Sequence, residues 1–134
     1  MLTVSELSKE VEMTTDAVRH YVRIGLLLPS RDPVNGYKLF SREDIKKAKF
    51  IRKAKSLGFT LQNIRTIFEH SSADKTPCLA VRNMIQQHID NNRVRLAELN
   101  KIQQRMEAAV QKWSAMPDGI PDGKAICHLI ESIS

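Results

Sequence analysis

The sequence predicts a mainly α-helical fold that contains one small hairpin and one very long helix. Three observations support this fold class. Two short amphipathic segments near the N-terminus are separated by about three residues. An Asn-Gly pair at 35–36 lies between short apolar segments, which is a strong hairpin signal. The 36 residues after Pro77 contain neither Pro nor Gly, and they carry an apolar repeat with a coiled-coil period.

Threonine caps mark the first two helices. Thr3 is the predicted N-cap of the first, and Glu6 three residues later completes a capping box. Thr14 or Thr15 caps the second helix, which is predicted to end at Gly25. The apolar faces are Val4, Leu7 and Val11 in the first helix, and Val18, Val22 and Leu26 in the second. Two short helices joined in this way are typical of a helix-turn-helix.

The next segments predict a hairpin and two further helices. Residues 28–41 contain two prolines and the Asn-Gly pair, so they predict a two-stranded wing. Ser41 caps a third helix that runs to about Leu57, and Thr60 caps a fourth. The side chains expected to face inward are Ile45, Ala48, Ile51 and Ala54 in the third helix, and Leu61, Ile64, Ile67 and Phe68 in the fourth.

The long helix is expected to pair with a second copy of the chain. Steps of four and three residues define a seam in which seven of nine positions are apolar. The seam consists of Ile85, Ile89, Asn92, Leu96, Leu99, Gln103, Met106, Val110 and Trp113. No other segment is long enough to cover it, although packing within one chain is the alternative. The predicted organisation is 1–70 for a winged helix-turn-helix domain, 71–77 for a linker, 78–113 for the coiled-coil helix and 114–134 for a loop and short helix.

Positive charge is concentrated in the N-terminal half. Residues 1–70 contain 13 Lys and Arg against 8 Asp and Glu, a net charge of +5, whereas residues 71–134 contain 8 against 7. This asymmetry predicts a polyanionic partner, with nucleic acid as the obvious one, or else a solvated basic surface. The chain lacks an 18-residue apolar run and a signal-peptide pattern, and its two cysteines do not imply a disulfide framework. We therefore expect a cytoplasmic protein without a membrane partner. No enzyme motif is recognisable, so we expect no enzyme.

The order of these segments resembles the MerR family of bacterial transcription regulators over essentially the whole chain. The matching stretches are "TVSELSKEVEMTTDAVRHYVRIGLL", "NGYKLFSREDIKKAKFIRKAKSLGFTLQNIRTIF" and "PCLAVRNMIQQHIDNNRVRLAEL". The resemblance implies a homodimer that binds inverted-repeat promoter DNA and acts with RNA polymerase. It also implies an activator that distorts an overlong promoter spacer when an effector binds. A pure coiled-coil interaction protein is the competing interpretation.

A recognition helix presents its N-terminal residues to the major groove, so Arg19 is expected to contact a guanine edge or a phosphate. The resemblance implies a phosphate contact for Tyr21. In the wing, Gly36 is expected to have a positive φ, and the backbone N–H groups of Asn35 and Gly36 are expected to face the DNA. The complete set of expected DNA contacts is Thr14, Thr15, Arg19, Tyr21, Arg23, Asn35, Gly36, Tyr37, Lys38, Lys49, Arg52 and Lys53.

The resemblance also implies a metal effector. The branch that senses divalent zinc, cadmium, lead or mercury carries a cysteine at the position of Cys78, and Cys127 corresponds to its second tail cysteine. An antiparallel coiled coil would bring Cys78 of one protomer close to Cys127 and His128 of the other. Two thiolates and an imidazole are ligands suited to soft divalent metals.

The tail departs from that branch at one ligand position. Trp113 stands where those relatives carry a first tail cysteine, and Asp118 and Asp122 are possible replacement ligands. Two alternatives remain open. Trp113 would line an apolar pocket for an organic effector, or Cys127 would act as a redox switch.

Overall fold

The computed structural model describes residues 1–120 and 123–134, and it divides into two compact units. The first unit, Met1–His88, is called the head, and the second is Ile89–Ser134. The elements are α1 (Val4–Val11), α2 (Thr15–Arg23), β1 (Ser30–Arg31), β2 (Lys38–Leu39), α3 (Arg42–Ser56), α4 (Leu61–Ser72), α5 (Cys78–Trp113) and α6 (His128–Glu131). The mainly helical fold with one long helix is therefore confirmed.

The helices begin at the caps that the sequence predicted. Thr14 rather than Thr15 is the N-cap of α2, because its hydroxyl oxygen accepts a hydrogen bond from the Ala17 N–H at 3.0 Å. Hydrogen bonds from the backbone and side chain of Thr3 lower the pKa of the exposed Glu6 carboxyl below its ordinary value. The capping boxes are Thr3–Glu6 in α1, Ser41–Asp44 in α3 and Thr60–Asn63 in α4. Local side-chain chemistry thus sets these boundaries.

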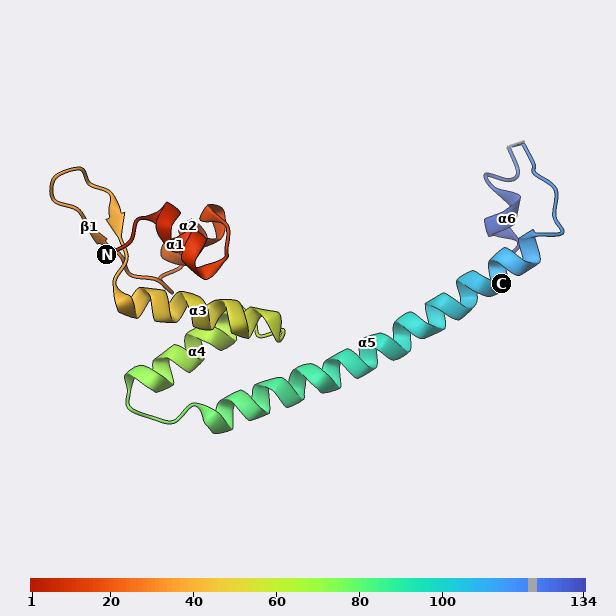
Figure 1. The fold of residues 1–134 in the computed structure, drawn as a ribbon. Coiled ribbons are helices and arrows are strands. Elements are labelled where there is room, and N and C mark those ends of the chain that lie inside the picture. The colour runs from red at the N-terminus through yellow and green to blue at the C-terminus, as the bar shows by residue number, and fades with distance from the viewer. Residues whose placement is uncertain (121–122) are drawn as a thin grey trace. The chain divides into compact units, whose positions relative to one another are not determined.

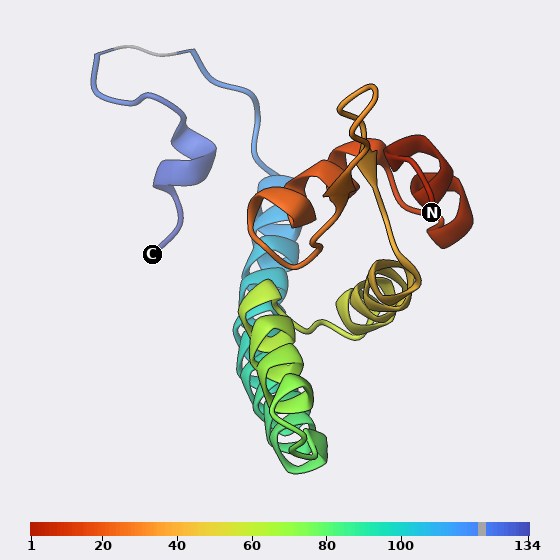
Figure 2. The ribbon, with the colours of Figure 1, turned by 90° about the vertical axis from the view of Figure 1, so that its left-hand side faces the viewer.

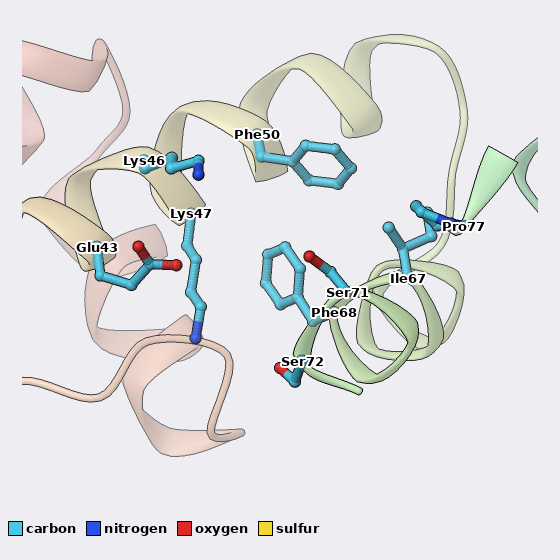
Figure 3. A pocket seen from close by; sticks show the side chains of 9 residues that line it. All are labelled: Glu43, Lys46, Lys47, Phe50, Ile67, Phe68, Ser71, Ser72 and Pro77. Atoms are coloured by element: carbon cyan, nitrogen blue, oxygen red, sulfur yellow. The ribbon is translucent and has the colours of Figure 1, made fainter. Parts of the chain in front are cut away.

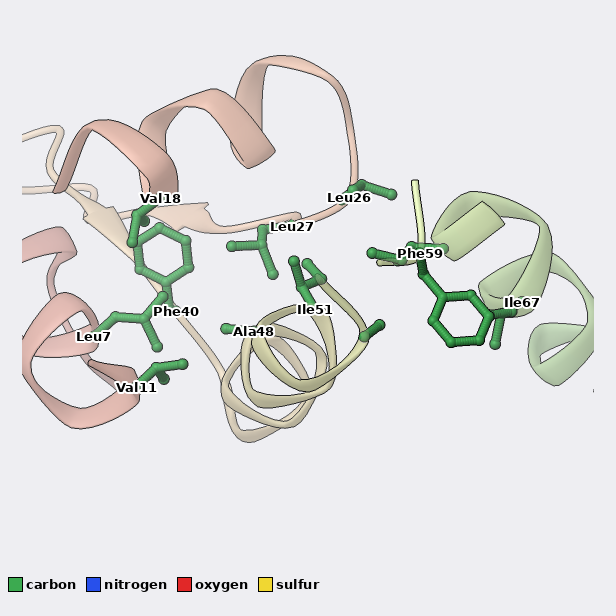
Figure 4. Close-up of a cluster of buried hydrophobic side chains, with 12 residues drawn as sticks. Leu7, Val11, Val18, Leu26, Leu27, Phe40, Ala48, Ile51, Phe59 and Ile67 are labelled. Atoms are coloured by element: carbon green, nitrogen blue, oxygen red, sulfur yellow. The ribbon is translucent and has the colours of Figure 1, made fainter. Parts of the chain in front are cut away.

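The core of the head lies where α1 to α4 meet (Figure 4). The fully buried side chains include Leu7, Val18, Leu27, Phe40, Ile51 and Ile64. Phe40 enters this core directly after β2, and its backbone forms an isolated bridge with Leu2 through N–H···O distances of 2.7 and 3.0 Å. The start of the chain is thereby fastened to the wing.

The wing consists of β1, β2 and the loop between them, and its strands pair Ser30 with Leu39 and Arg31 with Lys38. The loop projects beyond the helices of the head (Figure 1 and Figure 2). The predicted hairpin is present, but its loop spans residues 32–37 instead of a two-residue turn at the Asn-Gly pair. The Gly36 N–H donates to the Asp32 carbonyl at 2.8 Å, and Gly36 has the expected positive φ, +73°. Pro33 lacks an amide hydrogen, so the ladder does not continue through it.

Asp44 holds the segment before the wing against the start of α3. It is 4% exposed, and its carboxylate accepts hydrogen bonds from the Leu28 N–H at 3.0 Å and from the Ser41 N–H and hydroxyl at 3.3 and 3.2 Å. From the sequence alone, Asp44 is an acidic residue three positions after the predicted cap Ser41. Its contact with Leu28 depends on the tertiary fold.

We expect Asp44→Ala to lower the free energy of unfolding by about 3 kcal/mol, because it leaves buried donors without an acceptor. Asp44→Asn keeps one acceptor oxygen and should lose roughly half as much. Urea unfolding followed by circular dichroism, at one fixed protein concentration, measures both losses. An Asp44→Ala variant as stable as the wild type would refute this role of the carboxylate.

The first turns of α5 belong to the head, and its later turns belong to the second unit. Val81, Met84 and Ile85 pack against the core of the head. In the second unit, the Trp113 Nε1–H donates to the Leu129 carbonyl at 2.7 Å, and Lys112 Nζ donates to the Ser132 carbonyl. These bonds fasten the α6 segment to the end of α5. None of the helices in the described part of the chain combines the length and apolar character needed to cross a membrane.

Candidate DNA-contact surface and effector site

Arg19 is available for DNA contact on the outer side of α2. Its side chain is 53% exposed and lies 3.4 Å from both the Asp16 carboxylate and the Thr15 hydroxyl. An ion pair this long and this exposed is weak, so the guanidinium can exchange it for a base edge or phosphate. Thr14 uses its oxygen to cap α2, which leaves its hydroxyl hydrogen for another acceptor.

Tyr21 and Arg23 occupy different environments. Tyr21 is half-buried against the core, its ring centroid lies 5.8 Å from that of His20, and its carbonyl accepts from the Leu26 and Leu27 N–H groups. Arg23 is exposed at the end of α2. Packing therefore fixes Tyr21, whereas the Arg23 guanidinium extends into solvent.

The wing offers side chains rather than the backbone amide expected at Gly36. That amide donates inside the loop, and the Tyr37 N–H donates to the Asn35 side chain at 3.0 Å. Tyr37 is 65% exposed and Lys38 is half-buried. Arg31, which the sequence did not single out, braces the loop by donating to the Gly36 carbonyl at 3.2 Å.

The exposed cations of α3 include one ion-paired arginine and a separate group that lines a hollow. Arg52 forms a 2.9 Å ion pair with Glu12. Glu12 lies at the turn between α1 and α2 and has a positive φ, +59°. Lys49 and Lys53 instead line a shallow hollow of about 450 Å³. Its remaining lining residues are Arg42, Ile45, Lys46 and Phe50. Because Arg42 and Lys46 precede Lys49 and Lys53 at spacings of seven, the four cations lie on one face of α3. The sequence missed Arg42, which this spacing identifies.

Each unit contains one of the two predicted thiol ligands. Cys78 is exposed in the head, at the first residue of α5. Cys127 in the second unit is half-buried before α6, and its N–H donates to the Glu131 carboxylate at 3.1 Å. Cys127 and His128 line a cavity of about 590 Å³ together with Asp118. Asp122 lies outside the described residues.

The hydrogen bond at His128 fixes which ring nitrogen can bind a metal. Its Nε2 lies 2.8 Å from the Pro117 carbonyl, which only accepts, so in the neutral ring Nε2 carries the proton and the lone pair is on Nδ1. A Cβ at position 119 would overlap the ring, so Gly119 makes room for it. A metal-bound histidine commonly donates its other nitrogen to a backbone carbonyl in this way.

The donor set fits a soft divalent metal in chemistry, but one chain does not complete it. Within residues 1–120 and 123–134, no three His, Cys, Asp or Glu side chains lie close enough together to hold a metal ion. Cys127 and His128 supply two donors of the kind that zinc binds. A further ligand must come from elsewhere.

Two other hollows bear on the alternative of an organic effector. One, of about 450 Å³, contains Trp113, Met106 and Val110 of the seam together with Ile130 and Ile133. The other, of about 250 Å³, lies between α3 and α4, where Phe50 and Lys47 surround Phe68 (Figure 3). It is smaller than sites for drug-sized ligands, which span roughly 300–1,000 Å³. The first hollow lies partly on the seam, so pairing of two chains would cover it.

Comparison with known proteins identifies the family. A family model described as MerR HTH family regulatory protein matches residues 2–71, and one described as MerR, DNA binding matches residues 45–109. The regulator ZntR of Escherichia coli K12 is 26% identical over 134 residues, covering 99% of this chain and 92% of ZntR. A probable heavy metal-dependent transcriptional regulator of Haemophilus influenzae is 27% identical over 106 residues, covering 79% and 83% of the two chains.

A solved structure supports the same fold. PbrR691 from Ralstonia metallidurans CH34, determined in complex with lead(II), superposes with a TM-score of 0.77 over the full length of both chains at 20% identity. The helix-turn-helix, the wing and the long helix thus occur in the order that the sequence predicted. The chain belongs to the MerR family and is a DNA-binding transcriptional regulator rather than an enzyme.

Proposed function

We propose that this regulator is a homodimer, paired along the seam, that binds inverted-repeat promoter DNA with two heads. The observation that carries this proposal is the exposure of the seam in a single chain. Leu96, Leu99 and Val110 are 64%, 61% and 64% exposed. An exposed, mostly apolar stripe of this kind is typical of an interaction surface. Asn92 and Gln103 would fix the register of the pair.

The effector is a soft divalent metal ion, and zinc, cadmium, lead and mercury are the candidates. In an antiparallel pair, the start of one α5 meets the end of the other. Cys78 of a second copy then joins Cys127 and His128, and Asp118 is the nearby oxygen donor. The bound ion would supply a fixed, positively charged link between these donors.

Metal binding would change transcription by changing the shape of the bound DNA. The paired α5 helices set the separation of the two heads. Each α2 enters a major groove while the wing and α3 contact flanking phosphates, so a shift of the heads favours a different DNA geometry. An activator of this type aligns the promoter for RNA polymerase in the cytoplasm.

A mixed dimer tests the metal site directly. Cys78→Ser and Cys127→Ser chains, each as a homodimer, should bind no metal, because every site lacks one thiolate. A dimer of one Cys78→Ser chain with one Cys127→Ser chain retains a single complete site, so it should bind about half the wild-type amount of cadmium. Differential tags isolate this dimer, and elemental analysis counts the metal. His70→Ala, which removes a histidine outside the proposed site, serves as the control and should bind the wild-type amount.

The other results have distinct meanings. A mixed dimer without metal would show that both thiolates come from the same chain, and metal retained by both homodimers would exclude these cysteines altogether. Wild-type protein that binds no zinc, cadmium, lead or mercury would favour an organic or redox signal instead.

A further inference from the structure

Arg65 of α4 reaches the C-terminal end of α2. Its Nη2 donates to the carbonyl of Ile24, the residue that caps this helix. Gly25 follows with a φ of +80°, and a Cβ there would lie 4.0 Å from the Arg65 guanidinium. A cation at a helix C-terminus interacts favourably with the helix dipole. Arg65 is half-buried, and its guanidinium is already bonded to the protein.

His88 of α5 reaches the first turn of the same helix α4. Its Nε2 lies 2.8 Å from Asn63 Oδ1, which also accepts from the Thr60 N–H at 3.0 Å. Since this oxygen only accepts, His88 donates. The His88 ring is also edge-on to Phe59, with centroids 6.1 Å apart. Val81, Met84 and Ile85 form the face of α5 that packs on the core, and His88 continues this face by one turn.

We propose that α4 positions the recognition helix. Its Arg65 is hydrogen-bonded to the end of α2, and its Asn63 is hydrogen-bonded to His88 of α5. The inference rests on the proposed use of α2 as the recognition helix. The two contacts lie two residues apart on one rigid helix. A displacement of α5 at His88 is therefore transmitted through α4 to Ile24, and it changes how α2 lies in the groove. Arg65 and His88 are positioning residues that do not contact DNA.

The test measures DNA affinity of the full-length chain over a range of salt concentrations. The probes are a duplex selected by the wild-type protein from a random-sequence pool and a scrambled duplex of equal length. Arg65→Met and His88→Leu should each lower affinity for the selected duplex by about tenfold. The first removes the hydrogen bond between α4 and the end of α2, and the second removes the hydrogen bond that joins α5 to α4. Affinity for the scrambled duplex should hardly change, because non-specific binding depends on phosphate charge.

The salt dependence separates positioning from direct contact. Neither substitution should change the slope of log affinity against log salt, whereas loss of a phosphate contact lowers it by about 0.9 per contact. A reduced slope in Arg65→Met would therefore overturn the proposal. Arg65→Lys and His88→Gln keep a donor and should recover most of the affinity. Failure of both to recover any would also overturn it.

Two control variants show whether a loss of affinity comes from a folding defect or from a wrong choice of recognition helix. Ile67→Val weakens the core of the head without touching either contact, so it should lower the melting temperature and leave affinity unchanged. Equal loss of affinity in this variant would refute the positioning role. If Arg19→Ala leaves affinity unchanged, α2 is not the recognition helix. If Arg19→Ala weakens binding while Arg65→Met and His88→Leu do not, only the positioning proposal fails.

The two contacts should also depend on each other. A chain with both Arg65→Met and His88→Leu should lose little more affinity than either single variant, because α2 is already released. If the fold-loss of affinity in the double variant equals the product of the two single fold-losses, the two effects are independent. That result would contradict transmission through α4.

Discussion

A chain carrying Leu96→Asp and Leu99→Asp is expected to be monomeric and to lose nearly all specific DNA binding. Both leucines are exposed in one chain and would be buried by pairing along the seam. A dimer contains four such substitutions, and each forfeits about 2 kcal/mol of apolar burial before any cost of burying a carboxylate. The total of about 8 kcal/mol corresponds to roughly a 10⁶-fold weaker dimer.

Analytical ultracentrifugation and DNA titration of the same samples measure this effect. Lys101→Asp is the matched control, because it places a carboxylate on the opposite face of α5 and should leave the dimer intact. If the double variant stays dimeric, the seam does not hold the chains together. If it becomes monomeric but binds the selected duplex with wild-type affinity, the heads act independently.

Replacing Arg19 with alanine is expected to have the next largest effect, on affinity for the selected duplex. Loss of one arginine contact costs about 1–3 kcal/mol, and the dimer would lose two of them. The combined loss of about 2–6 kcal/mol corresponds to roughly 30- to 10⁴-fold in affinity. The Arg19 guanidinium lies 3.4 Å from Asp16 and from Thr15, and such long, exposed contacts compete little with DNA.

The pattern of that loss also identifies the contact. A base contact relaxes sequence preference at one position of each half-site, whereas a phosphate contact weakens all sequences alike and lowers the salt slope by about two per dimer. Lys55→Ala serves as the control, because Lys55 is exposed near the end of α3 and is expected to be solvated. Wild-type affinity for Arg19→Ala would favour a coiled-coil interaction protein with an incidental basic head.

The parts of the fold that depend on neighbouring residues were predictable from the sequence. Thr3, Ser41 and Thr60 cap their helices through side chains three residues away, so the pattern alone indicated each boundary. The length of α5 followed from its unbroken period. The wing loop was less predictable, because hydrogen bonds of Asp32 close it beside the Asn-Gly pair.

The contacts that join distant segments were not predictable. Arg65 bonds to a carbonyl 41 residues away, and His88 bonds to Asn63 across 25 residues. No local pattern distinguishes these side chains from solvated ones. The candidate metal site shows the same limit. The sequence indicated the donor types at Cys127 and His128, whereas only the fold reveals that Pro117 fixes the tautomer of the ring.

The mass of the wild-type chain in solution tests the central claim most directly. Sedimentation equilibrium at micromolar concentration should give twice the 15.3 kDa of one chain, and a complex with the selected duplex should contain two chains. A mass of 15.3 kDa for the free protein, together with a complex that contains one chain per duplex, would contradict pairing along the seam.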